Sequence, residues 1–197
     1  MTGILVLIPA AGASRRMRGA DKLLEPVGGQ PLLRHVAEQA VETGLPVLVT
    51  LPQCHSARHD ALAALAVAQQ EVDGTEGMAA SIRAGVTAAQ VAGADGLLVM
   101  LADMPEIDSF MLKALVASFA EDPGRIVRAA AEDGTPGNPV ILPARLFPAL
   151  SALTGDAGAR EVIRGETPRL HPLPGRAALT DLDTPEDWVA WRARKPR

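Results

Sequence analysis

The sequence is poor in aromatic residues and almost free of cysteine. Aromatic side chains make up 3% of its 197 residues, tyrosine is absent and Cys54 is the single cysteine. One cysteine excludes an internal disulfide framework and a thiolate zinc cluster, which is typical of proteins in a reducing cytoplasm. The shortage of aromatic rings removes the stacking platforms that bind single-stranded nucleic acid. Hydrophobic residues still form 48% of the chain, so the core must consist mainly of alanine, valine, leucine and isoleucine.

The chain also lacks an excess of positive charge and a long apolar run. Its net charge is −4, so it offers no general electrostatic field for the phosphates of DNA or RNA. Residues 1–9 are apolar, but this segment has no basic start and is far shorter than the ~20 residues of a membrane span. We therefore expect a cytoplasmic protein with no nucleic-acid partner and no membrane segment. Its length suits one domain, residues 1–197.

The apolar segments alternate between strand and helix patterns. Residues 4–8 are continuously apolar, as a strand buried on both faces requires, and a helix from about Pro31 follows. Strands separated by helical segments predict βαβ crossovers. We expect an α/β fold, with a Rossmann-like, doubly wound and mostly parallel sheet, helices on both faces, and ligands at the carboxyl ends of the strands. The further strands are expected at residues 47–49, before Asp73, at 96–101, 126–131 and 140–142, and from Thr180; the further helices are expected at 57–68, from Met78, at 108–120, and after a cap at Thr184.

A loop of small residues follows the first strand. Its members are Ala10, Ala11, Gly12, Ala13 and Ser14. Small side chains let backbone N–H groups approach an anion, and Arg16 and Lys22 would add positive charge beside a polyphosphate. The alternative is a plain turn followed by solvated arginines. Neither GxxxxGK[ST] nor GxGxxG is present, which disfavours a P-loop kinase and a dinucleotide oxidoreductase.

The segment from Leu7 to Leu24 resembles the signature (L/P)-A-A-G-x-S-x-R-M-G-x-x-K of the molybdenum cofactor cytidylyltransferase family, within the MobA-like NTP transferase superfamily. Five later segments match that family's G-M-S-x-S-(L/I)-R-A-G, (G/A)-D-M-P, G-H-P-V, G-D-x-G-A-R and D-x-D-T-P-E-D motifs. They are residues 77–85, 102–105, 137–140, 155–160 and 181–187. Because six matches occur in order along nearly the whole chain, the combined pattern is specific where each motif alone is weak.

The resemblance implies a nucleotide-diphospho-sugar transferase-like fold and a Mg²⁺-dependent transfer of CMP from CTP to the phosphate of molybdopterin, with release of pyrophosphate. It implies that residues 10–14 bind the nucleotide and that Ser81 lies near the base. It further implies that Arg16 and Lys22 neutralise the reacting phosphates and that Asp103 binds the metal. The implied partners are CTP and molybdopterin as substrates, and a molybdenum hydroxylase or its chaperone as recipient of the product.

Two acidic segments suit a metal site on physical grounds. Asp103 follows the apolar strand 97–101, which puts it at a carboxyl end, and Asp183 lies in the tail segment 181–183. Mg²⁺ prefers one or two carboxylates together with phosphate oxygens and water, so these two aspartates would suffice. The alternatives are a turn or helix cap at Asp103 and a turn before the last helix at Asp183. Nucleotidyl transfer needs positioning and charge neutralisation more than a protein nucleophile.

Several positions depart from the family pattern. Arg18 stands where the family has a glycine, Ala79 and Ala80 replace serines, and Asn138 replaces a histidine, which leaves the acceptor open. Three alternatives remain: a cytidylyltransferase for a sugar or polyol phosphate, a guanylyltransferase of the same cofactor, and a non-catalytic carrier of the finished cofactor. The A-A-G turn favours cytidine, because guanine-using relatives more often show A-G-G. The joint presence of Lys22 and both aspartates favours catalysis.

Overall fold

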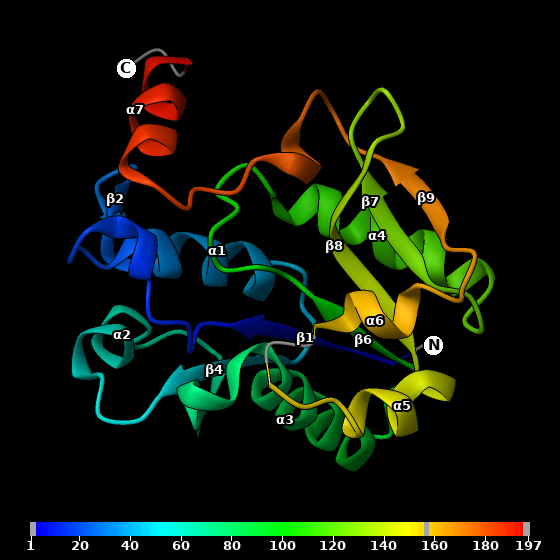
Figure 1. Ribbon diagram of the computed structural model, residues 1–197. Coiled ribbons are helices and arrows are strands. Elements are labelled where there is room, and N and C mark those ends of the chain that lie inside the picture. The colour runs from blue at the N-terminus through cyan, green and yellow to red at the C-terminus, as the bar shows by residue number, and fades with distance from the viewer. Residues whose placement is uncertain (1–2, 156–157, 195–197) are drawn as a thin grey trace.

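The computed structural model describes residues 3–155 and 158–194, which form an α/β fold around a seven-stranded sheet (Figure 1). The strand order is β5-β4-β1-β6-β8-β7-β9. The strands of this sheet are β1 (Ile4–Pro9), β4 (Val47–Pro52), β5 (Ala68–Val72), β6 (Gly96–Val99), β7 (Val127–Ala130), β8 (Pro136–Pro143) and β9 (Arg169–Pro172), and a small ribbon consists of β2 (Pro26–Val27) and β3 (Gln30–Pro31). The α-helices are α1 (Leu32–Val41), α2 (Ser56–Ala61), α3 (Gly77–Val91), α4 (Ser109–Glu121), α5 (Phe147–Ser151), α6 (Ala159–Ile163) and α7 (Pro185–Arg194).

Parallel pairing dominates the large sheet. β1 lies between β4 and β6 and runs parallel to both, β5 runs parallel to β4, and β9 runs parallel to β7. β8 is the exception, because it runs antiparallel to both β6 and β7. The carboxyl ends of β1, β4, β5 and β6 therefore share one edge of the sheet. The predicted mostly parallel, Rossmann-like α/β sheet is confirmed.

Each central strand contributes side chains to two cores. In β1, Ile4, Val6 and Ile8 join one hydrophobic cluster, while Leu5 and Leu7 join the other. Helices α1, α4 and α7 pack on the first cluster, and α3, α5 and α6 pack on the second, so helices cover both faces (Figure 1). Burial of this aliphatic surface stabilises the fold by roughly 25 cal/mol per Å², which explains why so few aromatic residues suffice.

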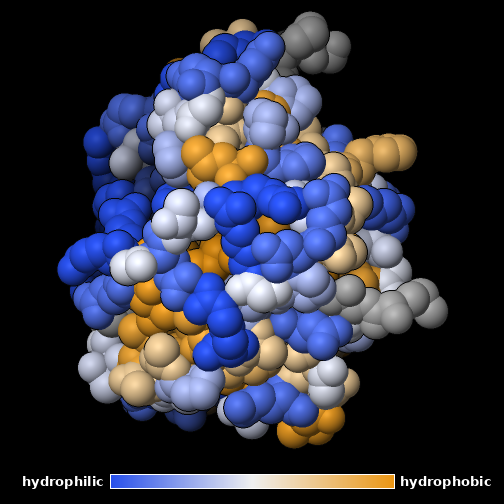
Figure 2. Space-filling model, turned by 90° about the vertical axis from the view of Figure 1, so that its right-hand side faces the viewer, coloured by the Kyte–Doolittle hydropathy of each residue, from blue (hydrophilic) through white to orange (hydrophobic). Residues whose placement is uncertain are grey.

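The outer surface is mainly polar on the face shown in Figure 2, where hydrophobic surface is limited to patches between hydrophilic groups. Within the described part of the chain, none of the helices combines the length and apolarity that crossing a bilayer demands.

The helix expected at residues 57–68 is wrong in its extent. Helix α2 ends at Ala61, Ala64 adopts a left-handed backbone with φ of 63°, and residues 68–72 form the edge strand β5. The alanine-rich sequence favours a helix locally, but the chain leaves the helix after Ala61 and turns, so that Ala68 can pair with Leu48 of β4.

The strand expected from Thr180 is also wrong, whereas the cap of the last helix is confirmed. Among the described residues, 180–183 pair with no strand and link a 3-10 helix, η5 (Ala177–Leu179), to α7. Thr184 N–H donates to Asp187 Oδ2 at 2.8 Å, and Asp187 N–H donates to Thr184 Oγ1 at 3.2 Å. This reciprocal pair is a capping box that satisfies backbone donors at the start of α7.

Candidate active site

The loop after β1 begins at the edge where the parallel strands end. Ala10 N–H donates to the carbonyl oxygen of Thr50 in β4 at 2.8 Å. Ser14 adopts a left-handed backbone with φ of 49°, which turns the chain into the 3-10 helix η1 (Arg15–Met17). The Ser14 hydroxyl donates to Asp21 Oδ1 at 3.1 Å. The loop is therefore fixed by contacts at both of its ends.

The side chain of Arg58, from α2, lies beneath this loop and is only 2% exposed. Its guanidinium donates to the carbonyl oxygens of Ala10 at 2.5 Å and Gly12 at 2.9 Å. It also donates to both carboxylate oxygens of Asp21, from Nε at 2.7 Å and from Nη2 at 2.8 Å. One buried cation thus connects the first half of the loop to its second half.

This arrangement decides which way the loop's peptide groups point. In a trans peptide the N–H is directed opposite to the preceding C=O. Because the carbonyls of Ala10 and Gly12 point toward Arg58, the N–H groups of Ala11 and Ala13 point away from it. Burial alone would raise the pKa of Asp21, but the hydrogen bonds and charge of Arg58 hold this pKa below its ordinary value. The carboxylate stays ionised as the anchor of the loop.

Three chain segments meet beside the loop at Lys22. Its Nζ donates to Asp103 Oδ2 at 2.6 Å and to Asp183 Oδ1 at 2.7 Å. The backbone carbonyl of Asp103 accepts from the N–H of Leu182 at 3.0 Å, which fixes the tail next to the end of β6. Arg16, whose side chain is 69% exposed, reaches Asp183 Oδ2 at 2.8 Å. The sequence-predicted residues Arg16, Lys22, Asp103 and Asp183 thus form one cluster.

The charges in this cluster are incompletely balanced. Burial works to lower the pKa of Lys22, but Asp103 and Asp183 outweigh it and raise this pKa. Burial raises the pKa of Asp181, and the negative charges of Asp103 and Asp183 raise it further. Asp103 Oδ1 is buried without a hydrogen-bond partner among the described residues. Three carboxylates face two cations, Lys22 and the exposed Arg16, and Asp103 keeps a free acceptor oxygen, which leaves capacity for a further cation.

A metal at this position would need ligands beyond the protein. No group of three or more His, Cys, Asp or Glu side chains is arranged to hold an ion anywhere in residues 3–155 and 158–194. Mg²⁺ commonly binds through one or two carboxylates plus substrate phosphates and water. The pair Asp103 and Asp183 fits that pattern, whereas a cage formed by protein ligands alone does not.

A cleft of about 610 Å³ joins the loop to the acidic cluster. Residues 10–13 line it together with Arg16, Lys22, Asp103 and Ser81. Ser81 is buried, and its Oγ accepts a hydrogen bond from the Thr50 hydroxyl at 2.8 Å. Ser81 therefore contributes to the wall of the cleft while its hydroxyl is engaged with β4. Such a cleft, with outward N–H groups and mobile cations, can hold a polyphosphate.

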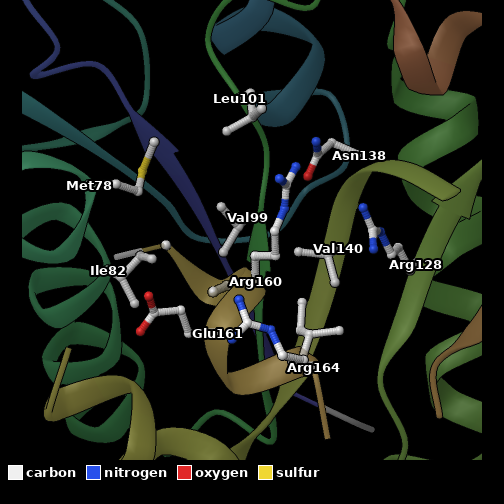
Figure 3. Close-up of a pocket in the computed structure, with 13 residues that line it drawn as sticks. Met78, Ile82, Val99, Leu101, Arg128, Asn138, Val140, Arg160, Glu161 and Arg164 are labelled. Carbon is white, nitrogen blue, oxygen red and sulfur yellow. The ribbon is translucent and has the colours of Figure 1, made fainter. Parts of the chain in front are cut away.

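Other predicted positions lie apart from this cleft. Asn138, in β8, lines a neighbouring cavity with Arg160 (Figure 3). Asp156 and Ala157 of the motif 155–160 lie outside the described residues. Gly19, which follows Arg18, has a positive φ of 100°, so the displaced glycine serves a left-handed turn one residue later than the family pattern implies.

Sequence reasoning missed Arg58 and did not give Asp181 a role. Arg58 lies in a segment that reads as an ordinary amphipathic helix, so no local pattern indicates that its side chain is buried. Asp181 differs, because its spacing of two residues from Asp183 in the D-x-D motif was a usable signal.

Comparison with known proteins supports this reading of the fold. A profile of the MobA-like NTP transferase domain matches residues 6–173. The purine catabolism protein PucB of Bacillus subtilis (strain 168) is 30% identical over 194 residues, covering 91% of each chain. The crystal structure of Rv0371c from Mycobacterium tuberculosis H37Rv has a TM-score of 0.81 at 27% identity, covering 96% of this chain and 97% of that one.

Further solved structures share the fold. A complex of Rv0371c with manganese has a TM-score of 0.80 at 25% identity, covering 98% of this chain and 100% of that one. The CMP:2-keto-3-deoxy-manno-octonic acid synthetase complexed with CTP has a TM-score of 0.75 at 15% identity, covering 98% of both chains, and shows the fold alone. Because the family profile spans most of its length, the chain belongs to the MobA-like NTP transferase domain family of nucleotidyltransferases.

Proposed function

We propose that this protein transfers CMP from CTP to the phosphate of molybdopterin and releases pyrophosphate, with Mg²⁺ as cofactor. The observation that carries the proposal is the position of Lys22, which touches Asp103 and Asp183 at 2.6 and 2.7 Å beside the cleft that residues 10–13 line. An anion-binding loop, a lysine and paired carboxylates are the parts that nucleotidyl transfer requires.

The reaction needs no protein nucleophile. An oxygen of the acceptor phosphate forms a bond to the α-phosphorus of CTP, while the bond from that phosphorus to the oxygen bridging the β-phosphorus breaks. Pyrophosphate leaves with that electron pair. The outward N–H groups of Ala11 and Ala13 hold phosphate oxygens, and Arg16 and Lys22 offset the charge that accumulates as the leaving group departs.

The metal would be held by Asp103 and Asp183. Its role would be electrophilic, stabilising negative charge on the phosphates. Support comes from the unpartnered Oδ1 of Asp103 and from the manganese complex of Rv0371c, a 25% identical protein of the same fold. Lys22 shares these carboxylates, so we expect it to turn toward the phosphates when nucleotide and metal bind.

The preference for CTP rests on Ala11. Its methyl group packs with Val72, Ala80 and Ala84 in a small buried cluster, and its carbonyl oxygen would lie 3.0 Å from a Cβ placed on Gly74. The loop and the segment after β5 are therefore in close contact at Ala11, and we propose that this contact sets the space available to the base. We also propose a cytoplasmic location and a molybdenum hydroxylase or its chaperone as recipient, in keeping with the resemblance to the molybdenum cofactor family.

Pyrophosphate release measured with molybdopterin, Mg²⁺ and each of the four NTPs tests this function. We expect turnover with CTP to exceed that with GTP, and Ala11→Gly to narrow the difference. A clear preference for GTP would make the protein a guanylyltransferase instead. Turnover with sugar or polyol phosphates but not molybdopterin would change the acceptor, and binding of finished cofactor without any pyrophosphate release would identify a carrier.

A further inference from the structure

A second cavity of about 600 Å³ adjoins the catalytic cleft. Met78 of α3 and Leu101, just after β6, line both spaces, so the two are adjacent. Residues of β7, β8 and α6 complete its walls (Figure 3). We call it the arginine pocket, after Arg128, Arg160 and Arg164 in its lining. Its volume is within the range of pockets that bind small organic molecules.

One side of the arginine pocket is apolar. Ile82 from α3, Val99 from β6 and Val140 from β8 form this surface together with Met78 and Leu101. Figure 3 shows these side chains directed into the space between α3 and β8. An apolar surface of this kind packs against the carbon skeleton or ring of a ligand and gains from its burial.

The other side carries positive charge that the protein does not neutralise. Within the described residues, none of the three arginines forms an ion pair with a carboxylate. Arg128 Nε donates to the carbonyl oxygen of Gly137 at 2.8 Å, which fixes its orientation and leaves its terminal N–H groups available. Burial and the charge of Arg160 both lower the pKa of Arg128. Two like charges are therefore held near each other.

The directions of the side chains indicate where a ligand's charge would lie. In Figure 3 the Arg160 side chain extends toward Asn138 and Leu101, whereas Glu161 extends toward Ile82. The single carboxylate in the lining thus points away from the Arg128 and Arg160 guanidinium groups. An anion between these groups would relieve their repulsion and accept charge-assisted hydrogen bonds from both.

We propose that the arginine pocket binds the nucleotidyl acceptor, an organic anion whose carbon skeleton lies on the apolar surface and whose anionic group is held by Arg128 and Arg160. This rests on the proposed function, because an acceptor phosphate must approach a triphosphate of the same sign. A separate pair of guanidinium groups lowers that repulsion without drawing Arg16 or Lys22 away from the nucleotide. A neutral alcohol or amine acceptor would leave these charges unmatched.

Inorganic phosphate is the probe for the first test, because it needs no turnover. In protein carrying Lys22→Met, which weakens the attraction of the catalytic cleft, calorimetric titration should still detect phosphate binding. Adding Arg160→Met should weaken it by about tenfold, the loss expected for one charge-assisted contact. Adding Lys113→Met should not, since Lys113 is exposed on α4, on the other face of the sheet. Unchanged phosphate binding after Arg160→Met would overturn the proposal.

Steady-state kinetics supply the second test. With CTP and molybdopterin, Arg128→Met and Arg160→Met should each raise the acceptor KM by about tenfold and leave the KM for CTP unchanged. An increase in the KM for CTP alone would contradict the assignment, and so would no increase in either KM. If wild-type protein releases no pyrophosphate while the phosphate titration behaves as expected, the proposed function fails and the anion site stands.

Discussion

At the scale of single residues, Lys22 joins Asp103 and Asp183, which come from distant parts of the chain. We expect Lys22→Ala to lower turnover by a factor on the order of 10² to 10³, since one preorganised charge facing the transition state is lost. Lys113→Ala is the matched control, with the same change of charge on exposed α4. Near-normal turnover of folded Lys22→Ala protein would remove Lys22 from the mechanism.

The two aspartates should respond differently to replacement by an amide. Asp103 lies four residues after the end of the buried strand β6, and its backbone carbonyl is tied to Leu182, so Asp103→Asn should abolish nearly all activity. Asp183 lies on the unpaired link before α7, so Asp183→Asn should weaken Mg²⁺ affinity more than it lowers the rate at saturating metal. Initial rates measured across a Mg²⁺ titration separate the two effects. Full activity of Asp103→Asn at ordinary Mg²⁺ would place the metal elsewhere.

Arg58 is a positioning residue whose effect should appear in nucleotide binding. Arg58→Met removes the donors that hold the carbonyls of Ala10 and Gly12, so kcat/KM for CTP should fall on the order of 10²-fold through misplacement of the loop. The acceptor KM should not change. Arg34→Met is the control, because Arg34 also donates to two backbone carbonyls, at 3.2 and 3.1 Å, but outside the loop. Equal losses for both variants would reduce Arg58 to a general stabilising role.

The sequence alone was enough to predict that Lys22, Asp103 and Asp183 belong to one site, because each occupies a motif position or follows a strand pattern. It could not find Arg58, whose function depends on a side chain reaching from α2 under a loop that begins 48 residues earlier. Nor could the sequence indicate that Arg128 and Arg160 lie near each other. They are brought together only when the chain folds back through the antiparallel strand β8. Hydrophobic periodicity indicates which face of an element is buried, but it does not indicate which group a buried charged side chain contacts.

At the scale of elements, strand β8 and η5 are in unusually close contact. A Cβ placed on Gly137 would lie 2.0 Å from the carbonyl oxygen of Ala178. Gly137→Ala should therefore lower the free energy of unfolding by about 1–3 kcal/mol through overpacking, and should displace the tail that carries Asp183. Gly165→Ala is the control, because no atom lies within 4 Å of its Cβ position. Urea unfolding and Mg²⁺ titration of both variants measure the two effects; wild-type values for Gly137→Ala would contradict this contact.

The sequence patterns predicted the strands that are apolar throughout. They were less informative for strands that depend mainly on pairing with a neighbouring strand. Continuous apolar runs such as residues 4–8 became central strands, as expected. The edge strand β5, expected only as a short strand before Asp73, has the sequence AQQEV with four of its five residues exposed, and this pattern did not reveal where the preceding helix ends. β9 is likewise half polar and alternates between intermediate and exposed residues. Edge strands form mainly because they pair with a neighbouring strand, and they do not require a hydrophobic pattern of their own.

At the scale of the whole molecule, we propose a single domain, as its length suggests. One hydrophobic cluster contains both Ile4 of β1 and Trp191 of α7, so the start of the sheet and the last helix share a core. The protein's two tryptophans, Trp188 and Trp191, lie on α7. We expect thermal unfolding followed by tryptophan fluorescence and by far-ultraviolet circular dichroism to coincide in one transition. A fluorescence change that precedes the loss of helix would show that α7 detaches independently.

The ion pairs of Lys22 also bear on the order of events in refolding. They join residues 81 and 161 positions apart, and contacts between such distant segments form slowly because loop closure costs entropy before the contact repays it. Helices and neighbouring strands need only local contacts. After dilution from denaturant, catalytic activity should therefore recover later than secondary structure. The length of this delay shows how late the contacts between the two ends of the chain form.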